Sequence, residues 1–223
     1  MDRELPGSYA AVPLNKAVRS EIPRKAIYRL SVYLRCLRLL QENKIRTVSS
    51  ETLAGSAHVK PTQLRKDLTY FGQFGIRGLG YDVEQLCLMI SDLLKTTSLQ
   101  PVILVGVGNL GLALLSYRGF EQEGFEIVAA FDVDLSPKSG KQVKQPILPI
   151  TELPGFIRDN SVRMAILTVP TSEAQEVTNN LVACGITGIL NFAPIVLHVP
   201  EPVIVNDVNL AIALENLSYF IQQ

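Results

Sequence analysis

The chain has 223 residues, enough for one large domain or two modest ones. Its 47% hydrophobic and 19% charged residues exclude a disordered tail and permit a buried core. The formal net charge is zero, yet residues 1–100 hold 15 Lys and Arg against 9 Asp and Glu, while residues 101–223 hold 6 against 12. This asymmetry favours two parts with different partners, the basic part facing nucleic-acid phosphates, with a merely solvated basic surface as the alternative.

Several classes of protein are not expected. No run of about 18 apolar residues is present, so we expect no membrane span. The first four residues lack the apolar core of a signal peptide. The three cysteines lie far apart, and the two histidines do not complete a metal-ligand spacing. We therefore expect neither a disulfide framework nor a metal site, and a cytoplasmic location.

The first hundred residues have a helical pattern. Residues 1–20 hold few periodic apolar positions and are predicted to form a flexible arm. From Pro23 onward, apolar residues recur at helical spacing between basic ones. The predicted inward stripe comprises Ile27, Leu30, Leu34, Leu37 and Ile45.

Two shorter helices, at about 50–57 and 61–71, are predicted next, with Ser50 capping the first and Pro61 opening the second. The second buries an apolar stripe, and its polar residues point elsewhere, as in the recognition helix of a helix-turn-helix. Arg and Gln can read base edges, whereas Lys and Thr mostly meet phosphate. The candidate DNA-contacting residues of this helix are Thr62, Gln63, Arg65, Lys66 and Thr69.

Residues 72–81 are rich in glycine, which permits a hairpin tip, and Arg77 is placed where a wing enters a minor groove. With a further helix at about 82–95, residues 21–97 are predicted to form a winged-helix DNA-binding domain. The alternative is an ordinary helical subdomain with a glycine-rich linker.

From Pro101 the pattern changes to short apolar runs that alternate with helices. Strands are predicted at 102–105, 127–131, 164–169 and 188–192, and helices at about 110–119 and 172–184. This alternation predicts an α/β fold with a parallel sheet. Ser172 and Gln175 match a capping box at the start of the second helix.

A glycine-rich loop follows the first of these strands. Residues 106–111 read Gly-Val-Gly-Asn-Leu-Gly, between a strand and a helix, the context that the dinucleotide-binding GxGxxG pattern requires. The first glycine permits the turn, the second admits the pyrophosphate, and the third lets the helix pack on the strand. The helix N-terminus favours the phosphate charge. The loop predicts that all six residues, Gly106, Val107, Gly108, Asn109, Leu110 and Gly111, contact a cofactor.

Asp132 ends the next predicted strand, 21 residues after Gly111 and close to the usual spacing for a ribose-binding carboxylate. A carboxylate there repels a 2′-phosphate, so NAD(H) is favoured over NADP(H). The alternatives are a vestigial fold that binds nothing and a site for another adenine nucleotide such as coenzyme A.

The second half offers no residue pair for catalysis. A dehydrogenase needs a positioned acid or base. His198, the only histidine of this half, lies in an apolar loop flanked by prolines, and Tyr117 is followed four residues later by Glu121 rather than by lysine. Binding without turnover is the simpler hypothesis, so no catalytic residue and no enzyme activity are expected. A small NAD-dependent oxidoreductase or coenzyme A module is the alternative.

The last helix, at about 208–221, is apolar around much of its circumference, with Leu210, Leu214, Leu217 and Ile221 on one face. It packs either on its own sheet or into a second copy, and a two-fold dimer suits a major-groove reader.

Taken together, these stretches resemble the Rex family of redox-sensing transcriptional repressors, over about residues 22–221. The resemblance rests on Gln63–Gly72, Gly78–Tyr81, Gly106–Gly111, Phe131–Asp134, Ile166–Pro170 and Gly185–Pro194. It implies a homodimer of a winged helix-turn-helix joined to a Rossmann-like NAD(H)-binding domain at 98–205, with a domain-swapped C-terminal helix at 206–223. It further implies binding to palindromic operator DNA at low NADH, release when NADH binds, and weak competition by NAD+.

The resemblance also implies roles for further residues. Added to the cofactor-binding set are Tyr117, Thr168, Pro170, Asn191 and Phe192, and added to the DNA-binding set are Arg29 and Tyr70. In the family, an acidic residue near the start of the last helix pairs either with an arginine on the first helix or with a tyrosine by the nicotinamide. Arg35 and Tyr117 match the arginine and tyrosine positions. Asn209 stands at the acidic position and carries no charge, while Asp207 lies two residues earlier. Asn209 therefore supplies no charge for a pair with Arg35.

Overall fold

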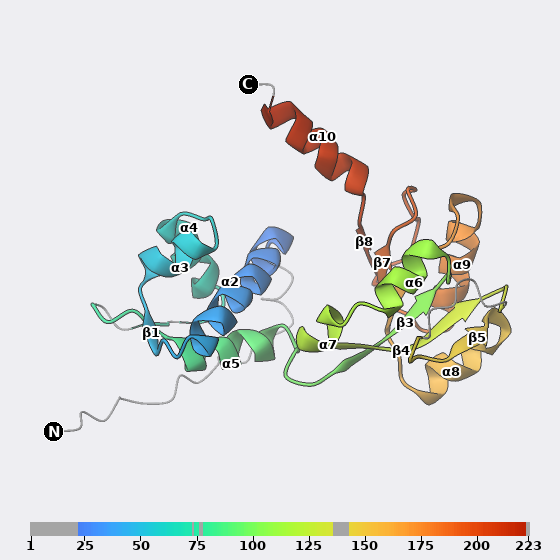
Figure 1. Cartoon of the computed structure of the whole chain (residues 1–223), viewed down its shortest axis with the longest axis horizontal. Helices are drawn as coiled ribbons and strands as arrows, with labels where there is room; N and C mark the ends of the chain where they lie inside the picture. Colours follow the sequence, from blue (N-terminus) through green and yellow to red (C-terminus); the bar gives the residue numbers. More distant parts are fainter. Residues whose placement is uncertain (1–21, 73, 76–77, 136–142, 222–223) are drawn as a thin grey trace. The chain divides into compact units, whose positions relative to one another are not determined.

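The computed structural model describes residues 22–72, 74–75, 78–135 and 143–221 (Figure 1). The chain divides into two compact units, Met1–Thr97 (unit 1) and Ser98–Gln223 (unit 2), where the basic helical sequence gives way to alternating strands. The predicted arm at 1–20 and the wing residue Arg77 lie outside the described residues. In the described part of the chain, no helix has both the length and the apolar character needed to cross a bilayer.

Unit 1 is a helical domain with a small antiparallel sheet. Its elements are α2 (Arg24–Glu42), β1 (Thr47–Val48), α3 (Ser50–Ser56), α4 (Pro61–Thr69), β2 (Tyr81–Asp82) and α5 (Val83–Leu93). Strands β1 and β2 pair antiparallel, which brings Gly80 beside Val48 and Ser49, just before α3. The four helices share one core to which the predicted stripes of α2 and α4 contribute. This is the arrangement of a winged helix-turn-helix.

Two predictions about unit 1 are wrong in detail. The predicted Leu30, Leu34 and Leu37 are buried, but Ile27 and Ile45 are exposed: Ile45 lies beyond the end of α2, and the buried face of α2 is completed by Ala26 and Tyr33. The cap of α3 is Ser49 rather than Ser50: the Ser49 hydroxyl accepts a hydrogen bond from the Thr52 backbone N–H at 3.0 Å. The hydroxyl of Ser50 is thereby left for a different contact.

Unit 2 is built on a six-stranded parallel sheet of order β5-β4-β3-β6-β7-β8. Its strands are β3 (Gln100–Val105), β4 (Phe125–Asp132), β5 (Ile147–Pro149), β6 (Met164–Leu167), β7 (Gly188–Asn191) and β8 (Ile204–Asp207). The chain starts in the middle of the sheet, winds outward to one edge, and returns to build the other half. This is the doubly wound order of dinucleotide-binding domains, whose ligands bind at the carboxyl ends of the central strands.

Helices cover both faces of the sheet (Figure 1). They are α6 (Asn109–Leu115), α7 (Gly119–Gln122), the short 3₁₀ helix η1 (Ile150–Glu152), α8 (Leu153–Asp159) and α9 (Thr171–Ala183). Alternate residues of β3 point to opposite faces. Ile103 and Val105 pack with α8 and α9, whereas Val102 and Leu104 pack with α6. The predicted fold class, an α/β Rossmann-like domain after a winged helix-turn-helix, is confirmed.

The sequence missed some elements of this unit. Strands β5 and β8, helix α8 and the break between α6 and α7 were not predicted. The predicted capping box at Ser172 is also wrong: α9 begins at Thr171 after Pro170, and no side chain caps it.

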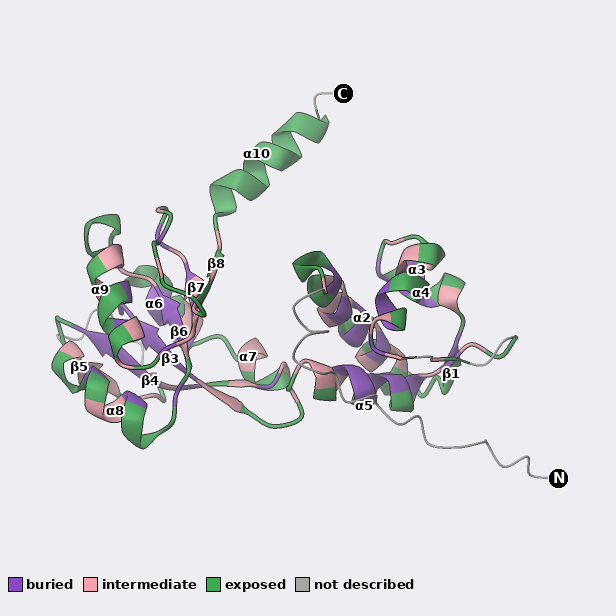
Figure 2. Cartoon of the chain, turned by 180° about the vertical axis from the view of Figure 1, so that it is seen from behind, coloured by how far each residue is buried: buried purple, intermediate pink, exposed green. Residues whose placement is uncertain are grey.

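The last helix, α10 (Leu210–Ile221), is exposed along its whole length (Figure 2, green). Apolar side chains stand in solvent on several of its sides, among them Leu210, Ile212, Leu214, Leu217 and Phe220. Packing on its own sheet, one of the two alternatives for this helix, is thus not what the structure has. A contiguous apolar surface of this kind marks a protein interaction site.

Candidate functional site

Four predicted cofactor positions meet at one edge of the sheet of unit 2. The parallel register pairs Val105 with both Phe131 and Leu167, and Leu167 with Asn191. The residues that follow these strand positions therefore emerge at the same edge. The glycine loop, Asp132, Thr168 and Phe192 consequently belong to one neighbourhood, at the carboxyl ends of the central strands.

The glycine loop is packed tightly against β6. Gly106 has φ +98°, and a Cβ there would lie 2.8 Å from the Thr168 carbonyl. A Cβ on Gly111 would lie only 2.1 Å from the Gly106 carbonyl oxygen. The Thr168 hydroxyl donates to the Gly106 carbonyl at 2.6 Å and also lies 3.1 Å from the Val105 carbonyl. Thr168 therefore clamps the loop, and two of the three glycines are required by packing alone.

The middle glycine has a different environment. A Cβ on Gly108 would meet no atom within 4 Å, so nothing in the protein requires a glycine there. Within the described residues, the backbone N–H groups of Gly108, Asn109 and Leu110 donate no hydrogen bond. Exposed, unpaired amides beside an open backbone are what a phosphate group requires, so the loop fits a pyrophosphate.

Asp132 lies against this loop. Its carboxylate accepts hydrogen bonds from the backbone N–H of Val107 at 2.6 Å and from that of Asp134 at 3.0 Å. The side chain is nearly buried, and the first of these bonds joins the end of β4 to the second residue of the loop. The carboxylate is thus positioned where the predicted ribose contact would be made.

The remaining predicted cofactor residues differ in exposure. Tyr117, just beyond α6, is exposed and packs edge-to-face on Phe120, with ring centroids 5.1 Å apart. Gly119 makes this possible, because a Cβ there would fall 2.3 Å from the Tyr117 ring. Phe192 is half-buried against the core on the α6 side, and Pro170 is exposed at the start of α9.

Asn191 is fully buried, and its side chain joins the end of β7 to the loop that follows it and to β8. Its amide nitrogen lies within 3.1 Å of the carbonyls of Ala193 and Ile195 and 2.8 Å from the Asp207 carboxylate, to which it donates. Its carbonyl accepts from the Ala193 N–H. These contacts give Asn191 a positioning role, and its predicted cofactor contact stays a prediction.

The predicted switch residues lie in both units: Arg35 in α2 of unit 1, and Tyr117, Asp207 and Asn209 in unit 2. The side-chain Oδ1 of Asn209 accepts hydrogen bonds from the backbone N–H groups of Ala211 and Ile212, so Asn209 caps α10. Asp207, by contrast, is tied to Asn191.

In unit 1, helix α4 presents a polar face. The side chains of Thr62, Arg65, Lys66 and Thr69 are exposed and recur at helical spacing, as the sequence predicted. The Thr69 hydroxyl donates to the Arg65 carbonyl at 2.7 Å, and Tyr70 is half-buried at the helix end. Exposed arginine, lysine and threonine on the second helix of this motif form a candidate nucleic-acid interface.

Two predicted DNA contacts are engaged inside the unit instead. The guanidinium of Arg29 donates twice to the buried carboxylate of Asp67, at 2.5 Å and 2.7 Å. The Tyr33 hydroxyl and the Gln63 amide each donate to the same carboxylate at 2.8 Å. We call these four residues the Asp67 cluster. It joins α2 to α4 and so fixes the orientation of the recognition helix, while direct DNA contact by Arg29 and Gln63 stays a prediction.

The electrostatics of the cluster favour an ionised Asp67. Burial by itself raises the pKa of this carboxyl, but the hydrogen bonds from Arg29, Tyr33 and Gln63 outweigh it and hold the pKa below its ordinary value. Burial and the bond to Asp67 raise the pKa of Tyr33, so its hydroxyl stays a donor. The cluster is therefore a charge-assisted network with a negative centre.

Asp67 is not among the predicted site residues, although its place in the sequence carries a signal. Asp67 falls between Leu64 and Leu68 on the apolar stripe of α4. A carboxylate on a buried stripe must be paired, since an unpaired buried charge costs several kcal/mol. What the sequence could not supply is the partner, because Arg29 lies 38 residues away.

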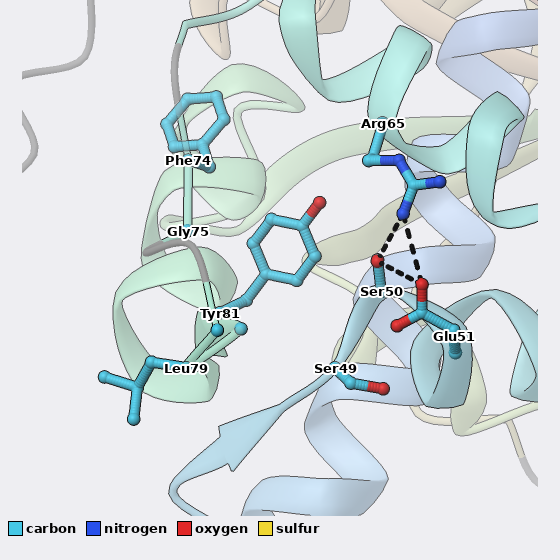
Figure 3. Close-up of a pocket in the computed structure, with 10 residues that line it drawn as sticks. Ser49, Ser50, Glu51, Arg65, Phe74, Gly75, Leu79 and Tyr81 are labelled. Carbon is cyan, nitrogen blue, oxygen red and sulfur yellow. Dashed lines mark hydrogen bonds and ion pairs between the residues drawn. The ribbon is translucent and has the colours of Figure 1, made fainter.

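Arg65 is joined to α3. Its Nη1 donates to the Ser50 hydroxyl at 2.7 Å and to the Glu51 carboxylate at 3.2 Å (Figure 3). Ser50 in turn donates to Glu51 at 3.1 Å. The Glu51 pKa is lowered by hydrogen bonds from its own backbone N–H and from the Ser50 and Arg65 side chains. This contact lies beside a hollow of about 410 Å³ between α3, α4 and the glycine-rich segment.

Comparisons with known proteins describe the same two units. A family model described as a putative DNA-binding protein N-terminus matches residues 21–69. A second, described as a CoA binding domain, matches residues 97–195. The first covers α2 to α4 and the second covers β3 to β7 with the glycine loop.

Relatives extend over nearly the whole chain. The sequence is 46% identical over 204 residues to the redox-sensing transcriptional repressor Rex of Carboxydothermus hydrogenoformans, covering 91% of this chain and 98% of the relative. It is also 46% identical over 209 residues to that of Streptomyces coelicolor, covering 93% of this chain and 81% of the relative.

Solved structures are similar over the same extent. A crystal structure of RSP in complex with beta-NAD+ and operator DNA superposes with a TM-score of 0.82 and 35% identity, covering 90% of this chain and 92% of that chain. The structure of RSP with beta-NADH gives a TM-score of 0.78 and 32% identity, covering 90% of this chain and 94% of that chain.

Proposed function

The chain belongs to the Rex family of redox-sensing transcriptional repressors, and we propose that it binds operator DNA through α4 and releases it when NADH occupies the glycine loop of unit 2. The chain is a DNA-binding regulator that senses NADH. The observation that carries the residue assignment is the pairing, in one chain, of an exposed basic recognition helix with an open phosphate-binding loop.

The proposed DNA interface is the exposed face of α4. Arg65 would read a base edge in the major groove, and Lys66 would meet phosphate, together with Thr62 and Thr69. Tyr70 at the helix end and Arg77 in the wing are further proposed contacts. Arg29 and Gln63 act, in this proposal, by holding α4 through Asp67.

The proposed nucleotide site is the carboxyl edge of the sheet. The amides of the glycine loop would hold the pyrophosphate of NADH or NAD+, with Asp132 at the adenosine ribose. Thr168, Pro170, Phe192 and the exposed ring of Tyr117 would line the nicotinamide side, and Asn191 would hold the end of β7. We propose that the dinucleotide acts as an effector and is not turned over. We further propose that the protein acts in the cytoplasm.

The expected effect of NADH on DNA binding is the first test. Coupling between two sites is reciprocal, so if NADH lowers operator affinity, operator DNA lowers NADH affinity by the same factor. We expect a factor of at least about tenfold, within the ordinary range of allosteric coupling. Titration of a palindromic operator by fluorescence anisotropy, with and without NADH, measures it. Equal operator affinity in both conditions would contradict the sensor function.

We propose that α10 forms the dimer interface, exchanged between two copies. Its exposed apolar side chains are then buried by the partner. Leu214→Asp places a charge in that interface, so we expect dissociation to monomers and loss of cooperative binding to a two-half-site operator, observed by analytical ultracentrifugation and gel shift. Asn216→Asp, a charge added on the same helix, is a control with a smaller expected effect. A Leu214→Asp chain that stays dimeric would exclude α10 from the interface.

The proposed switch differs from the family pattern at Asn209. Asn209 has no charge and caps α10, so it forms no ion pair with Arg35. Asp207 is the acidic residue near α10, and its bond to Asn191 links it to the end of β7, next to the proposed nicotinamide side. We propose that Asp207 and Asn191 carry the response to the nucleotide here, with Arg35 and Tyr117 as its partners.

A coenzyme A site is the second candidate, and the family model over residues 97–195 is the specific observation in its favour. Isothermal titration calorimetry with NADH, NAD+ and coenzyme A separates the candidates. We expect NADH to bind most tightly, NAD+ more weakly, and coenzyme A least.

A further inference from the structure

Residues of α3, α4 and the described part of the glycine-rich segment (74–75 and 78–81) line the hollow beside Arg65 (Figure 3). Of the two base-reading candidates of α4, Gln63 bonds to Asp67 of the same helix, whereas Arg65 bonds to another helix, α3. Its Nη1 is bound by Ser50 and Glu51, and its Nε and Nη2 make no hydrogen bond with any residue in the described ranges. One end of the fork is thus anchored while the other end is open.

We propose that Glu51 and Ser50 are positioning residues that set the guanidinium of Arg65 for reading one guanine, and so determine operator specificity. The inference rests on the proposed function of α4. A free arginine side chain has many rotamers, and ordering one of them on binding costs conformational entropy. A guanidinium already held in one orientation avoids part of that cost and restricts which base edge it can reach. Bidentate contact with guanine O6 and N7 needs two N–H groups, which Nε and Nη2 supply while Nη1 stays bound to Ser50 and Glu51.

The surroundings of Arg65 favour this role over an ordinary surface ion pair. Tyr81, nearly buried on β2, turns its hydroxyl toward the guanidinium across the hollow (Figure 3). Gly75 lies against the Tyr81 ring, where a Cβ would stand 3.0 Å away, and Gly80 passes so close to Val48 that a Cβ would lie 2.4 Å from its carbonyl. Gly75 and Gly80 therefore permit these close approaches, and Tyr81 forms the wall of the hollow opposite Glu51 (Figure 3).

The negative charge of Glu51 is expected to affect operator specificity and general DNA affinity in opposite directions. A carboxylate close to the DNA-facing side repels phosphate, so it weakens binding to any duplex. A residue that lowers general affinity yet holds the base reader acts to raise the ratio of specific to nonspecific binding. Removing Glu51 should accordingly lower operator affinity while leaving binding to unrelated DNA unchanged or slightly stronger.

The experiment uses the full-length protein. A palindromic duplex is selected from a randomised library with the wild-type chain, and affinities are measured for it, for a shuffled duplex, and for every single-base variant of one half-site. Arg65→Ala identifies the base pair that Arg65 reads. For Glu51→Ala we expect discrimination at that base pair to fall about tenfold, with the other positions unchanged. Glu51→Gln, which keeps an acceptor, and Ser50→Ala should give smaller losses at the same position.

Matched controls isolate the effect. Glu42→Ala removes an exposed carboxylate at the end of α2 and should change both duplexes equally. The double variant Arg65→Ala/Glu51→Ala should discriminate no worse than Arg65→Ala, because Glu51 acts through Arg65. If Glu51→Ala lowers the melting temperature, Glu51→Gln and Ser50→Ala carry the test in its place.

The outcomes are distinct. Loss of discrimination at the Arg65 position alone supports the inference. Full discrimination by the Glu51 variants, or an equal loss at every position, overturns it. NADH should lower the operator affinity of the Glu51 variants by the same factor as it lowers that of the wild type. If the wild-type chain selects no sequence, the proposed function fails together with this inference, whereas a selective wild type beside fully selective variants overturns the inference alone.

Discussion

Replacement of Asp67 by Asn is expected to lower the free energy of unfolding of unit 1 by about 3 kcal/mol at pH 7, because it leaves the Arg29 guanidinium without its buried counter-charge. The Arg29 side chain is 24% exposed and regains some water, which keeps the loss at the lower end of the range for a broken buried pair. Differential scanning calorimetry measures it. Operator affinity should fall too, because the cluster fixes α4 on α2.

The pH dependence of stability tests whether the ionised form of Asp67 is the one that stabilises unit 1. The pKa of Asp67 is lower in the folded chain than its unfolded value of about 3.9, so its stabilisation is present above pH ~4 and is lost as the pH falls through the folded pKa. The difference between wild type and Asp67→Asn should therefore be constant between pH 5 and 7 and shrink below pH ~4.

The control is Asp92→Asn on α5, a carboxylate without an ion pair among the described residues, for which a change within about 0.5 kcal/mol is expected. Tyr33→Phe removes one of the donors to Asp67 and should cost about 1–2 kcal/mol. Equal stabilities of wild type and Asp67→Asn at pH 7 would show that the cluster does not hold α4 in place.

Gly108→Val is expected to lower NADH affinity by at least about tenfold while leaving stability within about 0.5 kcal/mol of wild type. Gly108 has extended backbone angles that valine adopts, and its Cβ position opens to solvent. The added Cβ would therefore meet no atom of the protein, and the branched side chain would fill space into which a pyrophosphate must come. Calorimetric titration with NADH and thermal unfolding measure the two effects.

Gly111→Ala is the matched contrast within the same loop. Its added Cβ would lie 2.1 Å from the Gly106 carbonyl oxygen, so the backbone must shift, and we expect a loss of stability of about 3 kcal/mol along with weaker binding. With Gly108→Val, operator DNA should remain bound at NADH concentrations that release the wild type. NADH binding of wild-type strength by Gly108→Val would show that the dinucleotide does not approach the loop here.

The features that the sequence predicted well are those set by local order. The glycine spacing of residues 106–111, between an apolar strand and an apolar helix, requires only neighbouring residues and a period that repeats along the chain. The polar face of α4 follows from the same helical period. The three-residue strand β5 escaped prediction because so short a run does not define a period.

The sequence by itself determined the two-part organisation, the phosphate loop and the exposed side chains of the recognition helix, because each depends on residues close together in the chain. Only the tertiary structure decided which partners the charged and amide side chains bond to. It joins Arg29 to Asp67, Arg65 to Glu51 and Asn191 to Asp207. Packing of helices and pairing of strands bring those partners together from 14 to 38 residues apart, and no local pattern carries that information.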